Sequence, residues 1–462
     1  MVMLLLLRGR AAAAARFTPR AARFLRRALA PARRAHMASV SLDIAPSPKC
    51  LFDDPVRISV RGLSPLQAVT LRASLTDETG VLFRSSAQYT AESSGELDLT
   101  RSPSLGGSYT GVEPMGLVWS LLPETPFRRL VKRDVCSPLY LDLEVHDAHG
   151  PPGQPLAKAT NERAFMGEGV RRIPVREGKL KATLFVPPGP GPFPAVIDLY
   201  GTAGGLPEYR ASLFANRGFM TLALAYFGFE DLPQGLDALH LDYFGAAVEF
   251  LQMQQQANVS GIGVLGISKG ADLALSMATF LPGIKAAVSI SGCGVNVLTP
   301  LHGNGFTLSG LELIFEKIVF TADNAANSLE ALGDPADPVN AGCHIPVEKS
   351  PAAFLFLSGL DDQFIKSALF CELPIARLRK HGRDVEVHNY DGAGHLLEPP
   401  YLPLCRASYH KFMGMSTVWG GQTKKHARAQ EDAWFKIQNF LFRHLLDSNA
   451  KKPTHLHSLS TL

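Results

Sequence analysis

The 462-residue sequence lacks any run of about 18 apolar residues, the length that a membrane-spanning helix needs, and so predicts no membrane span. It has only six cysteines, which are scattered without a C-x-x-C pair, and its 14 histidines show no H-E-x-x-H spacing. In a long chain this usage is typical of reduced thiols and predicts neither a disulfide framework nor a metal site. We therefore expect no metal and no cofactor.

Residues 1–36 contain no acidic side chain, although they carry nine arginines and many alanines. This composition favours a cationic amphipathic helix and is typical of a mitochondrial transit peptide. The apolar run 2–7 is too short for a secretory signal, and a disordered basic tail is the alternative. We expect residues 1–36 to be removed or disordered and the protein to lie in the mitochondrial matrix. Initiation at Met37 instead gives a cytosolic form.

Outside this leader the sequence has no excess of basic residues. Without the nine leader arginines, the 46 basic residues fall to 37 against 42 acidic ones, and the net charge becomes −5. A mildly acidic chain gives no support to binding of nucleic acid or of an anionic membrane surface. The hydrophobic content of 46% and the length suffice for more than one core. We expect a monomer, with an oligomer as the alternative.

Between residues 38 and 165, short strand-like runs alternate with turn clusters such as LSP, DETG and SPSLGG. Turn signals at this spacing predict an all-β sandwich of immunoglobulin-like size. The predicted strands are 56–60, 69–74, 81–89, 97–99, 139–145 and 163–166. No polar cluster in this region resembles a catalytic set, so we expect it to act as a scaffold or lid.

From residue 168 to 447, strand-like and helical patterns alternate, which predicts a mostly parallel, doubly wound sheet covered by helices. The predicted strands are 180–186, 195–199, 221–226, 262–267, 286–291, 354–358 and 384–390. The predicted helices are 209–217, 239–254, one that begins at 269, 366–380 and 427–446. Residues 292–346 are expected to form an irregular insert, and the polar tail 448–462 is expected to be flexible.

The centre of this region is the stretch GIGVLGISKGADLALSM, residues 261–277. Gly266, Ser268 and Gly270 form the pattern G-x-S-x-G where an apolar strand gives way to a helical pattern. A serine at such a turn has an exposed Oγ, and the glycines let strand and helix approach closely. The N–H groups of the helix can then stabilise an oxyanion. The five-residue pattern alone is weak, but this context favours Ser268 as a nucleophile.

Partners for Ser268 are expected at the carboxyl ends of later strands, in the order serine, acid, histidine. One apolar strand is followed by Asp361 and Asp362, and the next strand by the loop DGAGH, which ends at His395. Asp362 lies one residue further into its loop and is the favoured acid, with Asp361 as the alternative. This order predicts acyl transfer in which His395 takes the proton of Ser268 and the aspartate orients the imidazole.

Two backbone N–H donors are expected to form the oxyanion hole. One belongs to Lys269, the residue after the candidate nucleophile. The other is expected in the loop DLYGTAGG after an early strand, where Gly201 or Thr202 fits; a plain glycine turn is the alternative. Because only the N–H of Lys269 is needed, we expect its side chain to face solvent.

Six longer stretches carry a family resemblance: EPMGLVWSLLPE, LVKRDVCSPL, DLYGTAGGLPEYRASL, LGISKGADLALSMATFLPGI, AGHLLEPPYLPLCRAS and WGGQTKKHARAQEDAW. With them the chain resembles the family of type I acyl-CoA thioesterases and bile acid-CoA:amino acid N-acyltransferases, over nearly everything after Met37. The resemblance implies an N-terminal β-sandwich followed by an α/β-hydrolase domain. It also implies a triad of Ser268, Asp362 and His395.

The same resemblance implies the reaction through the identity of the nucleophile. Serine members hydrolyse acyl-CoA to a free fatty acid and CoA, whereas cysteine members transfer the acyl group to glycine or taurine. Position 268 is serine, so hydrolysis of long-chain acyl-CoA is implied. Acyl transfer to an amino acid, ordinary carboxylesterase activity, and a binding protein without turnover are the alternatives.

Some features of the sequence bear on how closely this chain follows the family. Its arginine-rich leader further resembles the mitochondrial member. It departs from the family pattern at 363–365, where relatives usually carry tryptophan, and at Ala271, where glycine is common. The insert matches poorly, and we expect it to shape the acyl pocket.

Overall fold

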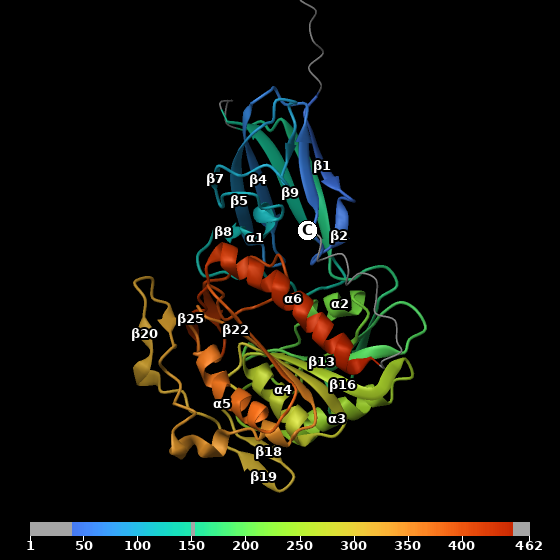
Figure 1. The fold of residues 1–462 in the computed structure, drawn as a ribbon, viewed down its shortest axis with the longest axis vertical. Coiled ribbons are helices and arrows are strands. Elements are labelled where there is room, and N and C mark those ends of the chain that lie inside the picture. Colours follow the sequence, from blue (N-terminus) through green and yellow to red (C-terminus); the bar gives the residue numbers. More distant parts are fainter. Residues whose placement is uncertain (1–38, 149–152, 447–462) are drawn as a thin grey trace, which may run out of the picture. The chain divides into compact units, whose positions relative to one another are not determined.

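The N-terminal part of the chain is built from two β-sheets that share a core. A computed structural model describes residues 39–148 and 153–446. A three-stranded sheet has the order β1-β3-β6, and a seven-stranded sheet has the order β2-β10-β9-β4-β5-β7 with β8 beside β5 (Figure 1). The strands are β1 (Ser41–Ala45), β2 (Lys49–Leu51), β3 (Arg57–Arg61), β4 (Ala68–Thr76), β5 (Leu82–Thr90), β6 (Leu97–Asp98), β7 (Gly106–Gly107), β8 (Leu122–Pro123), β9 (Leu139–Asp147) and β10 (Ala157–Ala164).

Burial along these strands has a period of two, as expected for a sheet with one face in a core. Buried side chains alternate with more exposed ones along β4 and β5, so one face of each strand enters the core. The core joins both sheets, because Ile58 of β3 and Leu71 of β4 belong to the same buried cluster. The predicted strand-rich character of this region, called the β-rich region below, is therefore observed.

In the β-rich region one predicted strand had the wrong bounds, and several short strands were missed. The strand predicted at 163–166 is the end of β10, which begins six residues earlier and pairs antiparallel with β9 from Ala157 opposite Val145. Its sequence AKATNERA is largely polar because six of its eight residues are at least partly exposed, so the apolar signal is missing. The strands β1 and β2 were not predicted, because each is short and the turn PSP separates them.

The C-terminal part is organised around an eight-stranded sheet in the order β11-β12-β14-β13-β16-β17-β22-β23. The strands from β14 to β23 run parallel, whereas β11 and β12 pair antiparallel with their neighbours. The strands are β11 (Arg171–Val175), β12 (Ala182–Val186), β13 (Phe193–Leu199), β14 (Met220–Leu224), β16 (Ala257–Ile267), β17 (Ile284–Ile290), β22 (Ala353–Gly359) and β23 (Val385–Tyr390). This is the predicted α/β-hydrolase architecture; only the exposed edge strand β11 was not predicted.

Helices cover both faces of this sheet (Figure 1). They are α2 (Tyr209–Asn216), α3 (Leu241–Gln252), α4 (Lys269–Phe280), α5 (Ser367–Lys380) and α6 (Thr423–Leu445). Phe214 of α2 and Trp434 of α6 lie in the buried cluster that continues into the β-rich region, next to the short helix α1 (Gly116–Trp119). Phe244 of α3 and Leu273 of α4 lie in a separate cluster on the other face. No helix in the described part of the chain is long and apolar enough to cross a membrane.

The predicted insert is largely irregular but contains short paired strands. These are β18 (Leu301–Gly303), β19 (Phe306–Leu308), β20 (Val319–Phe320) and β21 (Ala326–Asn327); β18 also pairs with β15 (Leu239–His240). The insert joins a hairpin that the sequence did not predict, β24 (Ala407–His410) and β25 (Met415–Val418), through the pairing of β21 with β25. The leader 1–36 and the tail 448–462 lie outside the described residues.

Candidate active site

The candidate nucleophile Ser268 lies on a sharp turn between β16 and α4. Its backbone has φ of 57° and ψ of −125°, a left-handed conformation that is strained for a residue with a side chain. The two glycines of the motif are required by space. A Cβ on Gly266 would overlap the carbonyl of Gly270, and one on Gly270 would lie 2.5 Å from the Tyr200 carbonyl oxygen. The turn is thus the strand–elbow–helix arrangement that the motif predicted.

The carboxylate of Asp362 lies in the loop after β22 and is held by four hydrogen bonds. Its Oδ1 accepts from the N–H groups of Phe364 (2.9 Å) and Ile365 (3.0 Å). Its Oδ2 accepts from the Ser367 hydroxyl and from His395 Nδ1, each at 2.8 Å. The alternative acid, Asp361, instead accepts from the N–H of Gly421 at 3.1 Å. The structure therefore brings Asp362, and not Asp361, to His395.

His395 lies in the loop after β23, and its ring is 1% exposed. The ring stacks on Trp419 at 5.6 Å between centroids, and the edge of Phe364 packs against it at 4.8 Å. With Nδ1 committed to Asp362, Nε2 has no hydrogen-bond partner among the described residues. His395 and Ser268 line the same cavity, although their side chains are not hydrogen-bonded to each other. Such bonds are often loose without substrate.

The proposed oxyanion loop passes directly beside the candidate nucleophile Ser268. A Cβ on Gly201 would lie 3.0 Å from the Ser268 Cβ, so a side chain at this position would crowd Ser268. Neither Gly201 nor Thr202 uses its N–H in a hydrogen bond with any described residue. The N–H of Lys269 belongs to the first turn of α4, where helices leave donors unpaired. Three candidate donors therefore lie around Ser268.

The expectation that the Lys269 side chain faces solvent was wrong, because it is 1% exposed. Its Nζ donates to the side chain of Asn296 at 2.7 Å and to the carbonyl of Val297 at 2.6 Å, both in the insert. Burial lowers the pKa of Lys269 and raises that of the neighbouring carboxyl of Asp272. The position after the nucleophile thus ties the elbow to the insert, which a local pattern cannot reveal.

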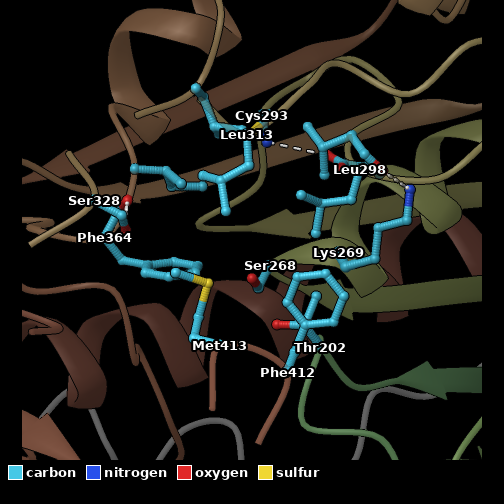
Figure 2. Close-up of a pocket in the computed structure, with 14 residues that line it drawn as sticks. Thr202, Ser268, Lys269, Cys293, Leu298, Leu313, Ser328, Phe364, Phe412 and Met413 are labelled. Atoms are coloured by element: carbon cyan, nitrogen blue, oxygen red, sulfur yellow. Dashed lines mark hydrogen bonds between the residues drawn. The ribbon is translucent and has the colours of Figure 1, made fainter. Parts of the chain in front are cut away.

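Two cavities meet at Ser268, and they differ in character. The first, here the apolar cavity, has a volume of 30 Å³ and lies between the elbow, the insert and the β24–β25 hairpin. Figure 2 shows the Ser268 hydroxyl there, close to Phe364 and Met413, with the Lys269 side chain running past it toward Leu298. Its lining residues are Thr202, Ser268, Lys269, Asp272, Cys293, Val297, Leu298, Leu313, Ser328, Leu332, Phe364, Ile365, Phe412 and Met413.

The second cavity, here the basic cavity, has a volume of about 450 Å³. It is lined by Ser268 and His395 together with segment 127–133 of the β-rich region, the oxyanion loop and the β24–β25 hairpin. Arginine and lysine side chains, but no carboxylate among the described residues, line it. Ser268 thus stands between an apolar side and a basic side.

Comparisons with known proteins place the chain in a family. The description "Acyl-CoA thioester hydrolase/BAAT N-terminal region" matches residues 53–177, and "BAAT / Acyl-CoA thioester hydrolase C terminal" matches residues 239–447. Human mitochondrial acyl-coenzyme A thioesterase 2 is 50% identical over 413 residues, which cover 89% of this chain and 85% of that protein. The chain belongs to the acyl-CoA thioester hydrolase/BAAT family.

Other members of the acyl-CoA thioester hydrolase/BAAT family match over almost their full length. Human acyl-coenzyme A thioesterase 1 is 49% identical over 88% of this chain and 97% of its own. Mouse acyl-coenzyme A thioesterase 5 is 48% identical over 90% of this chain and 99% of its own. Because these matches span both the β-rich region and the eight-stranded sheet, they cover every element that contributes to the candidate site.

Sequence reasoning missed several residues that surround the site in this family member. His410, on the unpredicted hairpin, has its Nε2 2.8 Å from the Thr202 hydroxyl. Burial, with a further contribution from His395, lowers its pKa to about 4, so its ring is neutral near pH 7. Phe364, one of the positions that departs from the family pattern, packs between His395 and His410. Only its place two residues after Asp362 could have drawn attention to it.

A second missed group connects the β-rich region to the oxyanion loop. Arg129 donates to the carboxylate of Glu398 and to the hydroxyls of Tyr200 and Tyr209. Glu398 also accepts from Tyr200 at 2.5 Å and from Tyr209 at 2.9 Å. Tyr200 immediately precedes Gly201, so this buried network fixes one end of the oxyanion loop. Tyr200 and Tyr209 lie in one stretch of the family resemblance and Glu398 in another, whereas Arg129 lies just before a third, and no local spacing links these segments.

Proposed function

We propose that this chain hydrolyses acyl-CoA thioesters through a serine acyl-enzyme, with Ser268 as nucleophile, His395 as general base and Asp362 as the orienting acid. The carboxylate of Asp362 on His395 Nδ1 carries the proposal. It fixes the tautomer with a free Nε2, and it stabilises the imidazolium that forms when Nε2 accepts a proton.

The reaction proceeds in two half-reactions. His395 Nε2 takes the proton of Ser268 as Oγ attacks the thioester carbonyl, and the N–H groups of Lys269 and of Gly201 or Thr202 stabilise the oxyanion. The carbon–sulfur bond breaks, and His395 gives the proton to the departing CoA sulfur. Water then attacks the acyl-enzyme, His395 takes one of its protons, and the fatty acid leaves as Ser268 regains a proton.

The direct test is hydrolysis of palmitoyl-CoA by the purified protein. The rate is measured as the release of the free thiol of CoA. We expect Ser268→Ala to reduce kcat by about 10³-fold or more, and Asp362→Asn to reduce it strongly while the fold is kept. Asp361→Asn is the matched control and should retain activity. Cleavage of simple esters without cleavage of the thioester would overturn the proposal in favour of a carboxylesterase.

Water is proposed as the acceptor because residue 268 is serine. A serine acyl-enzyme is an oxygen ester, which reacts less readily with amines than a thioester does. We therefore expect water, and not an amine, to release the acyl group. BAAT in the family name stands for bile acid-CoA:amino acid N-acyltransferase. Transfer of the acyl group to the amine of an amino acid is therefore the main alternative reaction. Adding glycine or taurine to the palmitoyl-CoA assay should leave fatty acid as the product. An acyl-amide product, detected by mass spectrometry, would instead make the chain an acyltransferase.

The apolar cavity is proposed to receive the acyl chain. Residues of the insert, among them Leu298, Leu313 and Leu332, form one wall, which supports the expected role of the insert in shaping the pocket. A volume of 30 Å³ cannot hold a long chain, so these side chains must move apart when a long acyl group enters. The kcat/KM values for a series of acyl-CoA substrates of increasing chain length measure how easily these side chains move apart.

We further propose that residues 1–36 direct the protein to the mitochondrial matrix. The acid-free, arginine-rich leader supports this, as does the mitochondrial relative at 50% identity. A fluorescent tag after residue 462 should co-localise with a matrix marker, and deletion of residues 1–36 should make the signal cytosolic. A cytosolic signal from the full chain would favour Met37 as the start.

A monomer is expected, which analytical ultracentrifugation can check.

A further inference from the structure

The basic cavity beside Ser268 concentrates positive charge on a chain that is acidic overall. Beyond the leader the net charge is −5, yet four cationic side chains and no described carboxylate line this cavity. Three of the four, Arg128, Arg133 and Lys411, are exposed and form no ion pair or side-chain hydrogen bond with any described residue. A concave surface lined by positive charges attracts anions and so raises their local concentration.

Hydrogen bonds and ion pairs hold the segment 127–133 so that two of these cations, Arg128 and Arg133, face the basic cavity. Arg129 is bound to Glu398, and the buried Lys132 is bound to Glu78 at 2.5 Å. The N–H of Arg133 also donates to Glu78, at 2.7 Å. These anchors fix the backbone on either side, while the guanidinium groups of Arg128 and Arg133 are left unpaired at the cavity. The arrangement resembles a binding site more than a solvated charged face, in which arginines commonly find partners.

The third cation that lines the cavity comes from a different region of the chain. Lys411 lies in the turn between β24 and β25, next to Tyr409, whose ring is 62% exposed and also lines the cavity. An exposed aromatic ring beside cations is the combination that binds a nucleotide, because a base can stack on the ring while the cations contact phosphate. Cations from two separate regions of the chain therefore line the same cavity.

We propose that Arg128, Arg133 and Lys411 bind the phosphates of the CoA moiety, namely its diphosphate and its 3′-phosphate. This inference rests on the proposed thioesterase function and assigns the nucleotide subsite of that function. The two cavities share Ser268, so an acyl-CoA with its thioester carbon at Ser268 has its fatty chain on the apolar side and its phosphates on the basic side. Arginine is suited to this role because its planar fork binds phosphate oxygens in pairs.

The test compares two substrates that share an acyl group and a thioester but differ in the nucleotide: lauroyl-CoA and lauroyl-pantetheine. In the full-length protein, Arg128→Ala, Arg133→Ala and Lys411→Ala should each raise KM for lauroyl-CoA by about three- to tenfold with little change in kcat. The triple variant should raise it by about 30-fold or more. KM for lauroyl-pantetheine should stay within about twofold of wild type, since this substrate has no phosphates to bind.

A triple variant with the same loss of charge elsewhere is the matched control. Arg72, Arg379 and Lys380 are exposed residues outside the cavity, and their joint change to alanine should leave both KM values unaltered. A thermal melt of each variant separates lost binding from lost folding. If the cavity triple variant fails to fold, the single Arg128→Ala and Lys411→Ala variants give the same comparison.

Competition with free anions distinguishes CoA from other phosphate ligands. Free CoA should inhibit lauroyl-CoA hydrolysis competitively, dephospho-CoA more weakly, and inorganic phosphate at the same concentration hardly at all. Equal inhibition by inorganic phosphate and CoA would show a general anion site and overturn the proposal. An equal rise of KM for both substrates would overturn it as well. If wild type cleaves neither thioester, the proposed function itself fails, whereas the subsite alone fails if the cavity variants cleave lauroyl-CoA like wild type.

Discussion

Single glycines decide whether the nucleophile elbow can form at all. Gly270 is a residue of α4, and a Cβ there would lie 2.5 Å from the carbonyl oxygen of Tyr200 and 2.6 Å from that of Leu199. These neighbours are backbone atoms of the strand that leads into the oxyanion loop, so they cannot turn aside as a flexible side chain can. The contact between α4 and this loop therefore depends on the absence of a side chain.

Gly270→Ala should consequently separate the elbow from the oxyanion loop. We expect a loss of stability of about 2 kcal/mol and a fall in kcat of about 10²-fold, measured by urea unfolding and by the thioesterase assay. Gly245→Ala in α3 is the matched control, because a Cβ there meets only the tip of Leu281 at 3.6 Å. It should be neutral or stabilising by up to about 1 kcal/mol. Equal effects of the two changes would show that space at Gly270 is not the cause.

The buried cation of Lys269 provides a second prediction at the residue scale. Lys269→Met keeps the length of the side chain but leaves the carboxyl of Asp272 buried without a nearby cation. Because the change also leaves the buried side-chain oxygen of Asn296 and the carbonyl of Val297 without their donor, the free energy of unfolding should fall by about 3 kcal/mol. Adding Asp272→Asn, which keeps an acceptor for the N–H of Cys293, should recover part of that loss, and the exposed Lys285→Met should have no effect. A double variant as unstable as the single one would contradict this account.

At the scale of elements, the sequence predicted those strands and helices whose own side chains carry the pattern. The central strands β13, β16, β17 and β22 are apolar on both faces because helices cover each side, and continuous apolar runs revealed them. The edge strand β11 and the hairpin β24–β25 were missed. They are strands because of the neighbours with which they pair, and their side chains are largely polar or exposed.

The candidate site divides in the same way. The placing of Asp362 and His395 was predictable, because active groups of a parallel sheet gather at the carboxyl ends of its strands. The burial of Lys269 was not, since its partners Asn296 and Val297 lie in the insert, which carries no periodic pattern. His410 could not be found either, because its position depends on the unpredicted hairpin. Local sequence patterns do not reveal contacts between segments that lie far apart in the sequence.

The helix α6 supports the loop of His395 through a second histidine, His426, and this gives a prediction on pH. His426 Nδ1 accepts from the N–H of Gly394 at 3.0 Å, and its Nε2 lies 3.1 Å from the carbonyl of Leu396. These two residues flank His395. Burial lowers the pKa of His426 to about 4, from 6.5, so the fold prefers the neutral ring that can accept this bond.

Since the pKa of the folded state lies below that of the unfolded state, acid must destabilise the fold. The stability due to the neutral His426 is fully present above pH 6.5 and is lost as the pH falls toward 4, by about 3 kcal/mol in all. The melting temperature and thioesterase activity should both decline over this range. His426→Asn keeps an acceptor that does not titrate and should flatten the decline, whereas the exposed His381→Asn should not. An unchanged pH profile in His426→Asn would refute the argument.

At the scale of the whole molecule, charged groups buried between the β-rich region and the helices make residues 40–446 one folding unit. Asp53, after β2, accepts from the guanidinium of Arg217 at 2.8 Å and from the indole of Trp434 at 2.9 Å. The apolar cluster of the β-rich region also continues into α2 and α6. Neither region can unfold alone without leaving a charge and a large apolar surface unpartnered. We therefore expect thermal unfolding in a single transition.

The neighbouring acids Asp53 and Asp54 test this coupling, because both pair with Arg217 but differ in burial. The side chain of Asp53 is 0% exposed and that of Asp54 is 33% exposed, each within 2.8 Å of the guanidinium. Asp53→Asn should cost about 3 kcal/mol, since it leaves the mostly buried Arg217 with one solvated partner, and Asp54→Asn should cost less than about 1 kcal/mol. Tryptophan fluorescence and far-UV circular dichroism should give the same midpoint in both variants, since Trp119 reports on the β-rich region and Trp434 on α6. Two separate midpoints, or equal costs for the two changes, would show that the regions fold independently of this buried pair.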